Sequence, residues 1–180
     1  MKRKRGVQEL LGAAGCPPAV TWRGKPWTVG FNTQEAKSVL EELIRQHVVR
    51  AAVRDKRAIG GEEGEAYFAD VTARLDRGHY KTMEPGWWAV LQDATAGTPL
   101  LVLSLMRPAH PDLTLEDVVS LADEEPEQLQ EALRVVAPDF FRHAARAARW
   151  KPEAVEKVAA AAEAMFGGLT STASSGPTGS

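Results

Sequence analysis

The sequence has little of what disulfide-linked, zinc-binding and membrane-spanning proteins require. Cys16 is the one cysteine among 180 residues, which excludes an internal disulfide and a cysteine-based zinc cluster. The most apolar run covers residues 100–106, whereas a membrane-spanning helix needs about 20 apolar residues. Residues 2–5 are basic, but polar residues follow them where a signal peptide has its apolar run. We therefore expect a protein of the cytoplasm.

Neither sign of charge is in large excess. The chain has 22 Lys and Arg against 24 Asp and Glu, which gives a net charge of −2. Such a balance creates no global field that would attract nucleic acid or a membrane surface. With 44% hydrophobic and 26% charged residues, the composition is that of a globular protein. A length of 180 residues is enough for one domain with its own core and a small appendage.

No motif of an enzyme, a metal site or a nucleotide-binding site stands out in the sequence. The histidines lie on separate predicted elements, without a carboxylate at ligand spacing; they are His47, His79, His110 and His143. The glycine-rich residues 60–64 follow no strand and lack the Lys-Ser/Thr pair of a phosphate loop, so they form a linker. We therefore predict no catalytic residue, no metal ligand and no cofactor, and hence a protein that is not an enzyme.

The residues near the N-terminus predict a β-hairpin. Two runs rich in β-branched and aromatic residues flank the turn residues 23–25. Alternation places Val20 and Trp22 on one face of the first strand, and Pro26 makes the second strand either an edge or irregular at its start. A two-stranded ribbon is marginally stable on its own, so its aromatic face must pack on helices or on a partner.

Helix caps and apolar spacing predict helices over most of the remaining chain. Thr114, with Asp117 three residues later, is a variant of the capping box, and Pro126 starts a further helix. The predicted helices cover residues 33–57, 62–77, 84–91, 100–106, the segments that follow Thr114 and Pro126, and residues 153–166. The fold class is therefore mainly α, an irregular helical bundle centred on residues 100–106 with a small N-terminal β-hairpin.

Shifts in composition divide the chain into four parts. We expect a flexible basic arm over residues 1–17 and a helical domain with its N-terminal hairpin over residues 18–137. Alanine-rich C-terminal helices follow over residues 138–166, and a disordered Ser/Thr/Gly-rich tail over residues 167–180. The basic arm is either a solvated terminus or a contact for nucleic acid.

A basic row and a helix-turn-helix spacing leave further alternatives open. The row Arg142, Arg146 and Arg149 is either solvated or faces an acidic partner helix or the acidic segment 123–131 of this chain. The spacing of residues 114–135 resembles a DNA-binding helix-turn-helix. Its would-be recognition helix and turn disfavour that reading, because Asp123, Glu124, Glu125, Glu127 and Glu131 would face phosphates with only Arg134 to oppose them.

The order of the elements resembles that of the tail assembly chaperones and related accessory proteins of long-tailed bacteriophages and prophages. A Trp-x-Gly-Lys-x-Trp hairpin over residues 22–27 precedes a long helix and an aromatic helix. The apolar helix 100–106 with Arg107 follows, and then the segment His-Pro-Asp-Leu-Thr-Leu-Glu-Asp-Val over residues 110–118. The resemblance covers residues 20–136 and leaves out both termini.

This resemblance implies a non-enzymatic function in phage tail assembly. Such proteins bind the tape-measure protein, keep its apolar stripes from aggregating and help recruit the tail-tube protein, without contact to DNA or membrane. The candidate partner-binding residues are Trp22, Trp27, Trp87 and Trp88, of which at least two are also expected in the core. The alternatives are a structural virion or head–tail connector component and, with less support, a DNA-binding regulator. Whether the chain forms a homo-oligomer stays open.

Overall fold

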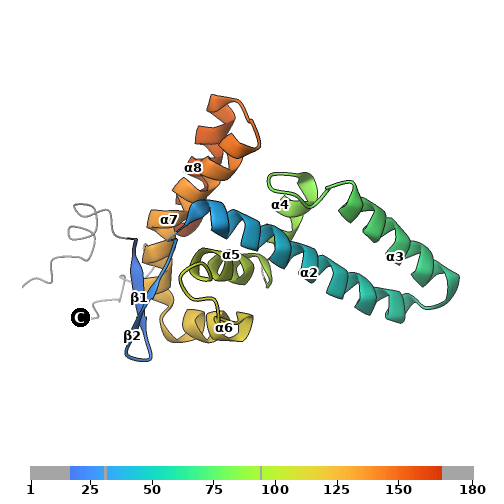
Figure 1. The fold of residues 1–180 in the computed structure, drawn as a ribbon, viewed down its shortest axis with the longest axis horizontal. Coiled ribbons are helices and arrows are strands. Elements are labelled where there is room, and N and C mark those ends of the chain that lie inside the picture. The colour runs from blue at the N-terminus through green and yellow to red at the C-terminus, as the bar shows by residue number, and fades with distance from the viewer. Residues whose placement is uncertain (1–16, 31, 94, 168–180) are drawn as a thin grey trace, which may run out of the picture.

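A computed structural model describes residues 17–30, 32–93 and 95–167, so most of the predicted basic arm and polar tail lie outside the described residues. Mainly helical, it confirms the predicted fold class (Figure 1). The elements are β1 (Ala19–Trp22), β2 (Lys25–Thr28), α2 (Thr33–Ile59), α3 (Gly61–Asp76), α4 (Pro85–Leu91), α5 (Gly97–Met106), α6 (Leu115–Glu124), α7 (Pro126–Ala147) and α8 (Pro152–Gly167).

Strands β1 and β2 form the predicted antiparallel hairpin. Arg23 and Gly24 both have positive φ angles, of 49° and 72°, which is the pattern of a type I′ turn. Val20 and Trp22 are buried as the alternation predicted, and β1 packs against α7. The hairpin is therefore held to the helical body by one apolar face.

Helix α5 lies at the centre of the fold. All of its residues from Leu100 to Met106 are buried, including the polar Ser104, whose hydroxyl donates a hydrogen bond to the carbonyl of Leu101 at 2.7 Å. Helices α2, α4 and α6 pack around it, and the backbone N–H of Gly30 donates to the carbonyl of Leu105 at 2.8 Å. A run that is apolar all round suits a helix enclosed on every side.

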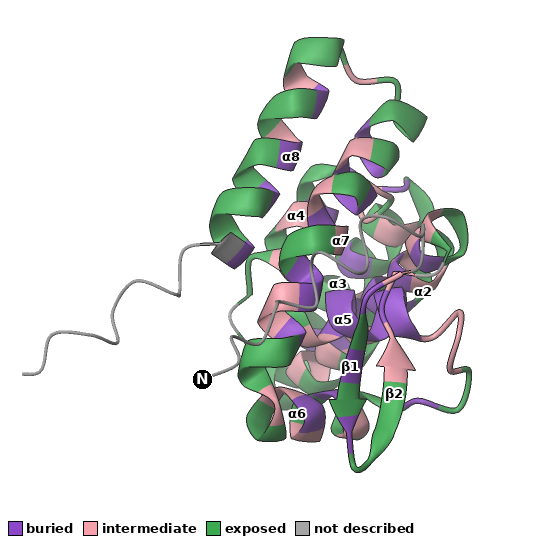
Figure 2. Cartoon of the chain, turned by 90° about the vertical axis from the view of Figure 1, so that its left-hand side faces the viewer, coloured by how far each residue is buried: buried purple, intermediate pink, exposed green. Residues whose placement is uncertain are grey.

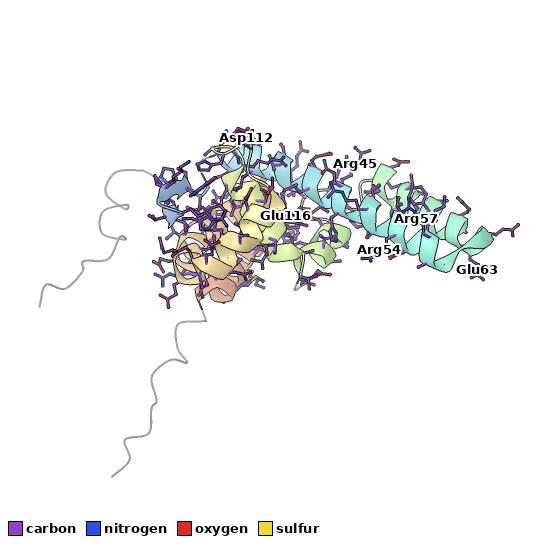
Figure 3. The ribbon with its side chains drawn as sticks, turned by 90° about the horizontal axis from the view of Figure 1, so that it is seen from below. Arg45, Arg54, Arg57, Glu63, Asp112 and Glu116 are labelled. Carbon is purple, nitrogen blue, oxygen red and sulfur yellow. The ribbon has the colours of Figure 1, made fainter. Side chains whose placement is uncertain are left out.

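Helices α2 and α3 form an arm that extends from the body (Figure 1). Gly60 and Gly61, with φ angles of 73° and 54°, reverse the chain between the two helices. The break in the helix is as predicted, but the linker predicted over residues 60–64 is wrong from Gly61 on, because α3 begins there. A Cβ atom at Gly64 would lie 2.6 Å from the carbonyl oxygen of Lys56, so the close approach of the helices requires glycine there. Exposed charged side chains, Arg54 and Arg57 among them, cover much of the arm (Figure 3).

Helix α7 differs from the prediction at residues 137 and 138. The expected boundary between the helical domain and the alanine-rich helices falls inside α7, which contains Pro138 and runs on to Ala147. Proline in a helix interior costs about 3 kcal/mol. Buried residues on both sides of it, including Leu133, Phe140 and Phe141, offset this cost by keeping one apolar face on the core.

Helix α8 packs along α7 and joins the same core (Figure 2). Its buried residues Val155 and Ala162 contact that core directly, so the alanine-rich part is continuous with the helical domain. The predicted basic row faces α8 in part, and the acidic residues that it pairs with lie outside the segment 123–131. Arg142 pairs with Asp139 and with Glu156 of α8, the latter at 3.2 Å. Within the described residues, no helix is long and apolar enough to cross a membrane.

Candidate binding site

His110, in the connection between α5 and α6, holds the outer edge of the hairpin. Its Nε2 accepts a hydrogen bond of 2.8 Å from the backbone N–H of Thr28, and its ring centroid lies 4.8 Å from that of Trp27. Because Nε2 is the acceptor, the neutral imidazole carries its proton on Nδ1. Partial burial lowers the pKa of His110 and favours this neutral form.

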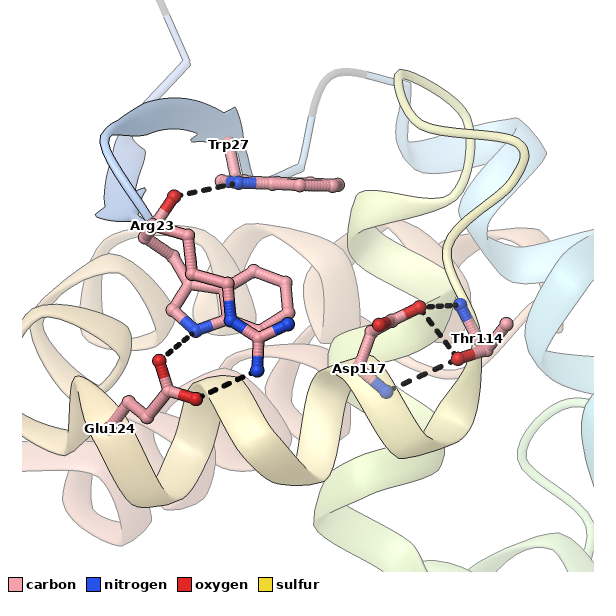
Figure 4. Close-up of polar contacts among 6 residues, drawn as sticks. Arg23, Trp27, Thr114, Asp117 and Glu124 are labelled. Atoms are coloured by element: carbon pink, nitrogen blue, oxygen red, sulfur yellow. Dashed lines mark hydrogen bonds and ion pairs between the residues drawn. The ribbon is translucent and has the colours of Figure 1, made fainter.

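Glu124 at the end of α6 binds the other strand of the hairpin (Figure 4). It accepts a hydrogen bond of 2.7 Å from Trp22 Nε1 and one of 2.9 Å from Arg23 Nη2. These bonds, that of Arg23 first, lower the pKa of the Glu124 carboxyl. The guanidinium carbon of Arg23 lies 4.2 Å from the centroid of the Trp22 ring, so Arg23 covers one face of that tryptophan.

The first turn of α6 contains a second bonded carboxylate beside the hairpin. Asp117 accepts hydrogen bonds from the hydroxyl group of Thr114 at 2.6 Å and from its backbone N–H at 3.0 Å. The backbone N–H of Asp117 donates to the same hydroxyl oxygen at 3.2 Å, which completes the predicted capping box (Figure 4). The Thr114 hydrogen bonds lower the pKa of Asp117.

Between the hairpin and these residues lies an open pocket of about 500 Å³, the hairpin pocket. Its walls are Trp22, Arg23, Lys25 and Trp27 of the hairpin, residues 109–113 of the α5–α6 connection, and Asp117. Trp27 is half-buried and offers part of its ring to the pocket, while Lys25 and Asp112 are exposed. The pocket therefore combines an aromatic wall with charged groups of both signs, of which Lys25 and Asp112 are exposed, and this set suits a protein side chain.

The outer edge of β2 offers little to an added strand. Pro26 has no backbone N–H, and the N–H of Thr28 is already bonded to His110. A partner strand would find no free donor at these two positions. The hairpin pocket therefore suits a side chain from a helix or loop better than β-strand addition.

The four candidate tryptophans fall into two clusters. Trp22 and Trp27 meet at the hairpin with ring centroids 5.5 Å apart. Trp87 and Trp88 of α4 are edge to face at 4.9 Å, and Trp88 stacks on Phe141 of α7 at 5.5 Å. This second cluster fixes α4 to α7 and lies outside the lining of the hairpin pocket.

Burial separates the tryptophans that can meet a partner from those that cannot. Trp22 is 2% exposed and Trp87 is fully buried, so in this conformation neither presents surface to a partner. The prediction that at least two of the four belong to the core is therefore confirmed. Trp27 and Trp88 are half-buried and keep some accessible ring surface.

Sequence reasoning missed the part that His110 and Asp112 play in this pocket. The sequence assigns His110 only to the segment 110–118 that carries the resemblance, because no carboxylate lies three or four residues from it. Its partner, Thr28, is 82 residues away in the chain. The hairpin and residues 110–118 both belong to the segments that carry the family resemblance, and this was the one signal in the sequence that could have linked them.

We expect the contribution of His110 to stability to disappear in mild acid. The pKa of His110 is lower in the folded protein than its ordinary value of 6.5, so the unfolded chain binds the proton first. This contribution is full above pH 6.5 and is lost as the pH falls below that value. Urea unfolding of wild type and His110→Gln, from about pH 7.5 to about pH 5.5, measures the difference.

The wild type should lose more stability over this range than His110→Gln does. Asp117 and Glu124 also titrate with lowered pKa values, but they do so below their ordinary range and equally in both proteins. Identical slopes of unfolding free energy against pH in the two proteins would show that His110 does not have the lowered pKa.

The described residues contain no metal site, and the comparisons with known proteins found no match. Among residues 17–30, 32–93 and 95–167, no group of three or more His, Cys, Asp or Glu side chains could hold a metal. No family model, curated protein or solved structure matches the chain.

Proposed function

We propose that this chain is a non-enzymatic, tail assembly chaperone-like protein that acts in the host cytoplasm. It binds the tape-measure protein of a long-tailed phage and assists the recruitment of the tail-tube protein. One observation carries the proposal. The hairpin 22–27, the apolar helix 100–106 and residues 110–118, which carry the family resemblance, converge through the contacts of Gly30 with Leu105 and of Thr28 with His110.

The hairpin pocket is the proposed contact for the tape-measure protein. An apolar side chain from a partner helix packs on the exposed part of Trp27, and polar neighbours on that helix pair with Lys25 and Asp112. Neither Lys25 nor Asp112 forms an ion pair within the described part of the chain. A half-open aromatic pocket holds a helix reversibly, as a chaperone must.

The chemical state of the pocket supports binding over catalysis. Glu124 is bonded to Trp22 and Arg23, and Asp117 is bonded to Thr114. The lowered pKa values of both carboxyl groups make them weak bases. His110 uses Nε2 to accept from Thr28, so neither this imidazole nor either of the two bonded carboxyl groups is free to act as a base.

Co-expression with the tape-measure protein tests the proposal. We expect the tape-measure protein to become soluble and to co-purify with this chain, and purified phage particles to lack the chain. Trp27→Ala should reduce the recovered partner at least about tenfold, because an aromatic anchor in a pocket contributes about 2 kcal/mol or more. Lys25→Glu, at an exposed position, should weaken binding without affecting the fold.

Trp88→Ala is the matched control, because it also removes a half-buried tryptophan but outside the hairpin pocket. It should leave the recovery of partner unchanged. If the tape-measure protein stays insoluble and the chain is found in several copies in finished particles, the chain is instead a structural or connector component. Binding to duplex DNA that weakens steeply with salt would instead favour the regulator.

A further inference from the structure

Two helices carry exposed faces outside the lining of the hairpin pocket, and these faces have the same layout and opposite charge. On α2, Val49 and Val53 are one turn apart, with Arg50 and Arg57 beside them; we call these four residues the basic α2 face. On α6, Leu115 and Val119 are one turn apart, with Glu116 and Asp123 beside them, the acidic α6 face. The spacing is the same on both faces. Relative to the first apolar residue, the second apolar residue is four positions later, and the two charged residues are one and eight positions later.

Both faces lack a partner in the described part of the chain. Val49 is 37% exposed, Leu115 is 40% exposed and Val119 is 45% exposed. None of the four charged side chains of the two faces forms an ion pair with another described residue. The view from below shows Glu116 over the body and Arg57 along the arm, so the faces are separated within one molecule (Figure 3).

We infer that the basic α2 face of one copy of this chain packs on the acidic α6 face of a second copy. The apolar pairs meet in the middle, and Arg50 and Arg57 pair with Asp123 and Glu116 when the helices run antiparallel. The two arginines are seven residues apart, as are the two acids, which places each pair about 10 Å apart along its helix. The charges therefore meet in register.

A two-fold arrangement uses both faces of each copy. The α2 face of each chain covers the α6 face of its partner, so the contact is made twice and the assembly closes at two chains. In the antiparallel arrangement, the side of α2 that carries Arg50 and Arg57 lies opposite the side of α6 that carries Glu116 and Asp123. In a parallel arrangement, the two arginines would instead lie opposite the side of α6 that lacks these acids. The antiparallel pairing is thus the one that the charge pattern selects.

Sedimentation velocity of the full chain tests this pairing. From about 10 to about 500 µM, a contact of a few apolar side chains and ion pairs is expected to associate weakly. We expect the mass to rise toward twice the 19.5 kDa of one chain, and the association to weaken with added salt. A monomer at every concentration, or a mass that continues to rise beyond two chains, would overturn the two-fold pair.

Charge reversal identifies the faces. Arg50→Glu with Arg57→Glu gives a chain with two acidic faces, and Glu116→Lys with Asp123→Lys gives one with two basic faces. Each variant alone should associate at least about tenfold more weakly than wild type, because like charges now oppose each other. An equimolar mixture of the two should regain association, because every contact is again between opposite charges. Dimerisation of either variant alone at the wild-type level would overturn the assignment.

Two controls keep the outcome tied to these surfaces. Glu163→Lys on α8 makes the same kind of charge change at an exposed residue away from both faces, and should associate as wild type does. Thermal unfolding followed by circular dichroism checks that each variant is folded. Should a reversal variant unfold, Val49→Ser and Val119→Ser remove the apolar contacts singly and should weaken association in the same way.

Discussion

A Leu103→Asp variant is expected to fail to fold. Leu103 is 2% exposed in the middle of α5, which is buried along its whole length from Leu100 to Met106. The substitution removes a packed side chain, at a cost of about 2–5 kcal/mol, and adds a carboxyl group without a hydrogen-bond partner, at several more. These costs together approach the whole stability of a domain, which is about 5–15 kcal/mol. Circular dichroism and size-exclusion chromatography of the purified variant measure the outcome.

Two control variants test whether the effect comes from a charge in the core rather than from any substitution at this position or any added carboxylate. Leu103→Met conserves volume and should cost less than about 1.5 kcal/mol. Val135→Asp places the same carboxylate on α7 at a side chain that is 47% exposed, where it should change stability little. A soluble Leu103→Asp protein that melts cooperatively would show that α5 is not the centre of the core.

We expect Gly97→Ala to destabilise the protein, against the ordinary preference of helices for alanine. Gly97 is the first residue of α5, and a Cβ atom there would overlap the carbonyl oxygen and carbon of Leu91. Since these atoms belong to the backbone, the end of α4 must move to make room. The expected loss is about 3 kcal/mol or more, whereas helix propensity alone predicts a gain of about 1 kcal/mol. Urea unfolding gives the sign directly.

Gly61→Ala provides the comparison for Gly97→Ala. Gly61 has a φ angle of 54°, but a Cβ atom there would meet nothing within 4 Å. The cost is then limited to the left-handed backbone conformation, about 1–2 kcal/mol. If Gly97→Ala proves more stable than wild type, α4 and α5 do not approach as closely as the structure has them.

Local chemistry in the sequence determined most of the secondary structure. Gly24 favours the hairpin turn, since glycine takes a positive φ angle readily. The hydroxyl and carboxylate of the Thr114–Asp117 capping box lie three residues apart and start α6 wherever that helix packs. The apolar run 100–106 predicted a buried helix because no face of it can meet water without cost. In each case the interacting groups lie within a few residues of one another.

Contacts between distant residues decided the rest. Pro138 looks like a boundary in the sequence, yet α7 continues through it because α8 and the core bury the residues on either side. Trp87 and Trp88 are adjacent in the chain, but only the packing of α4 on α7 makes one a core residue and leaves the other at the surface. The contact of His110 with Thr28 joins residues 82 positions apart, and no local pattern specifies it. Local propensities fix where helices and turns form, whereas burial of the whole set of apolar faces fixes which residues remain accessible to a partner.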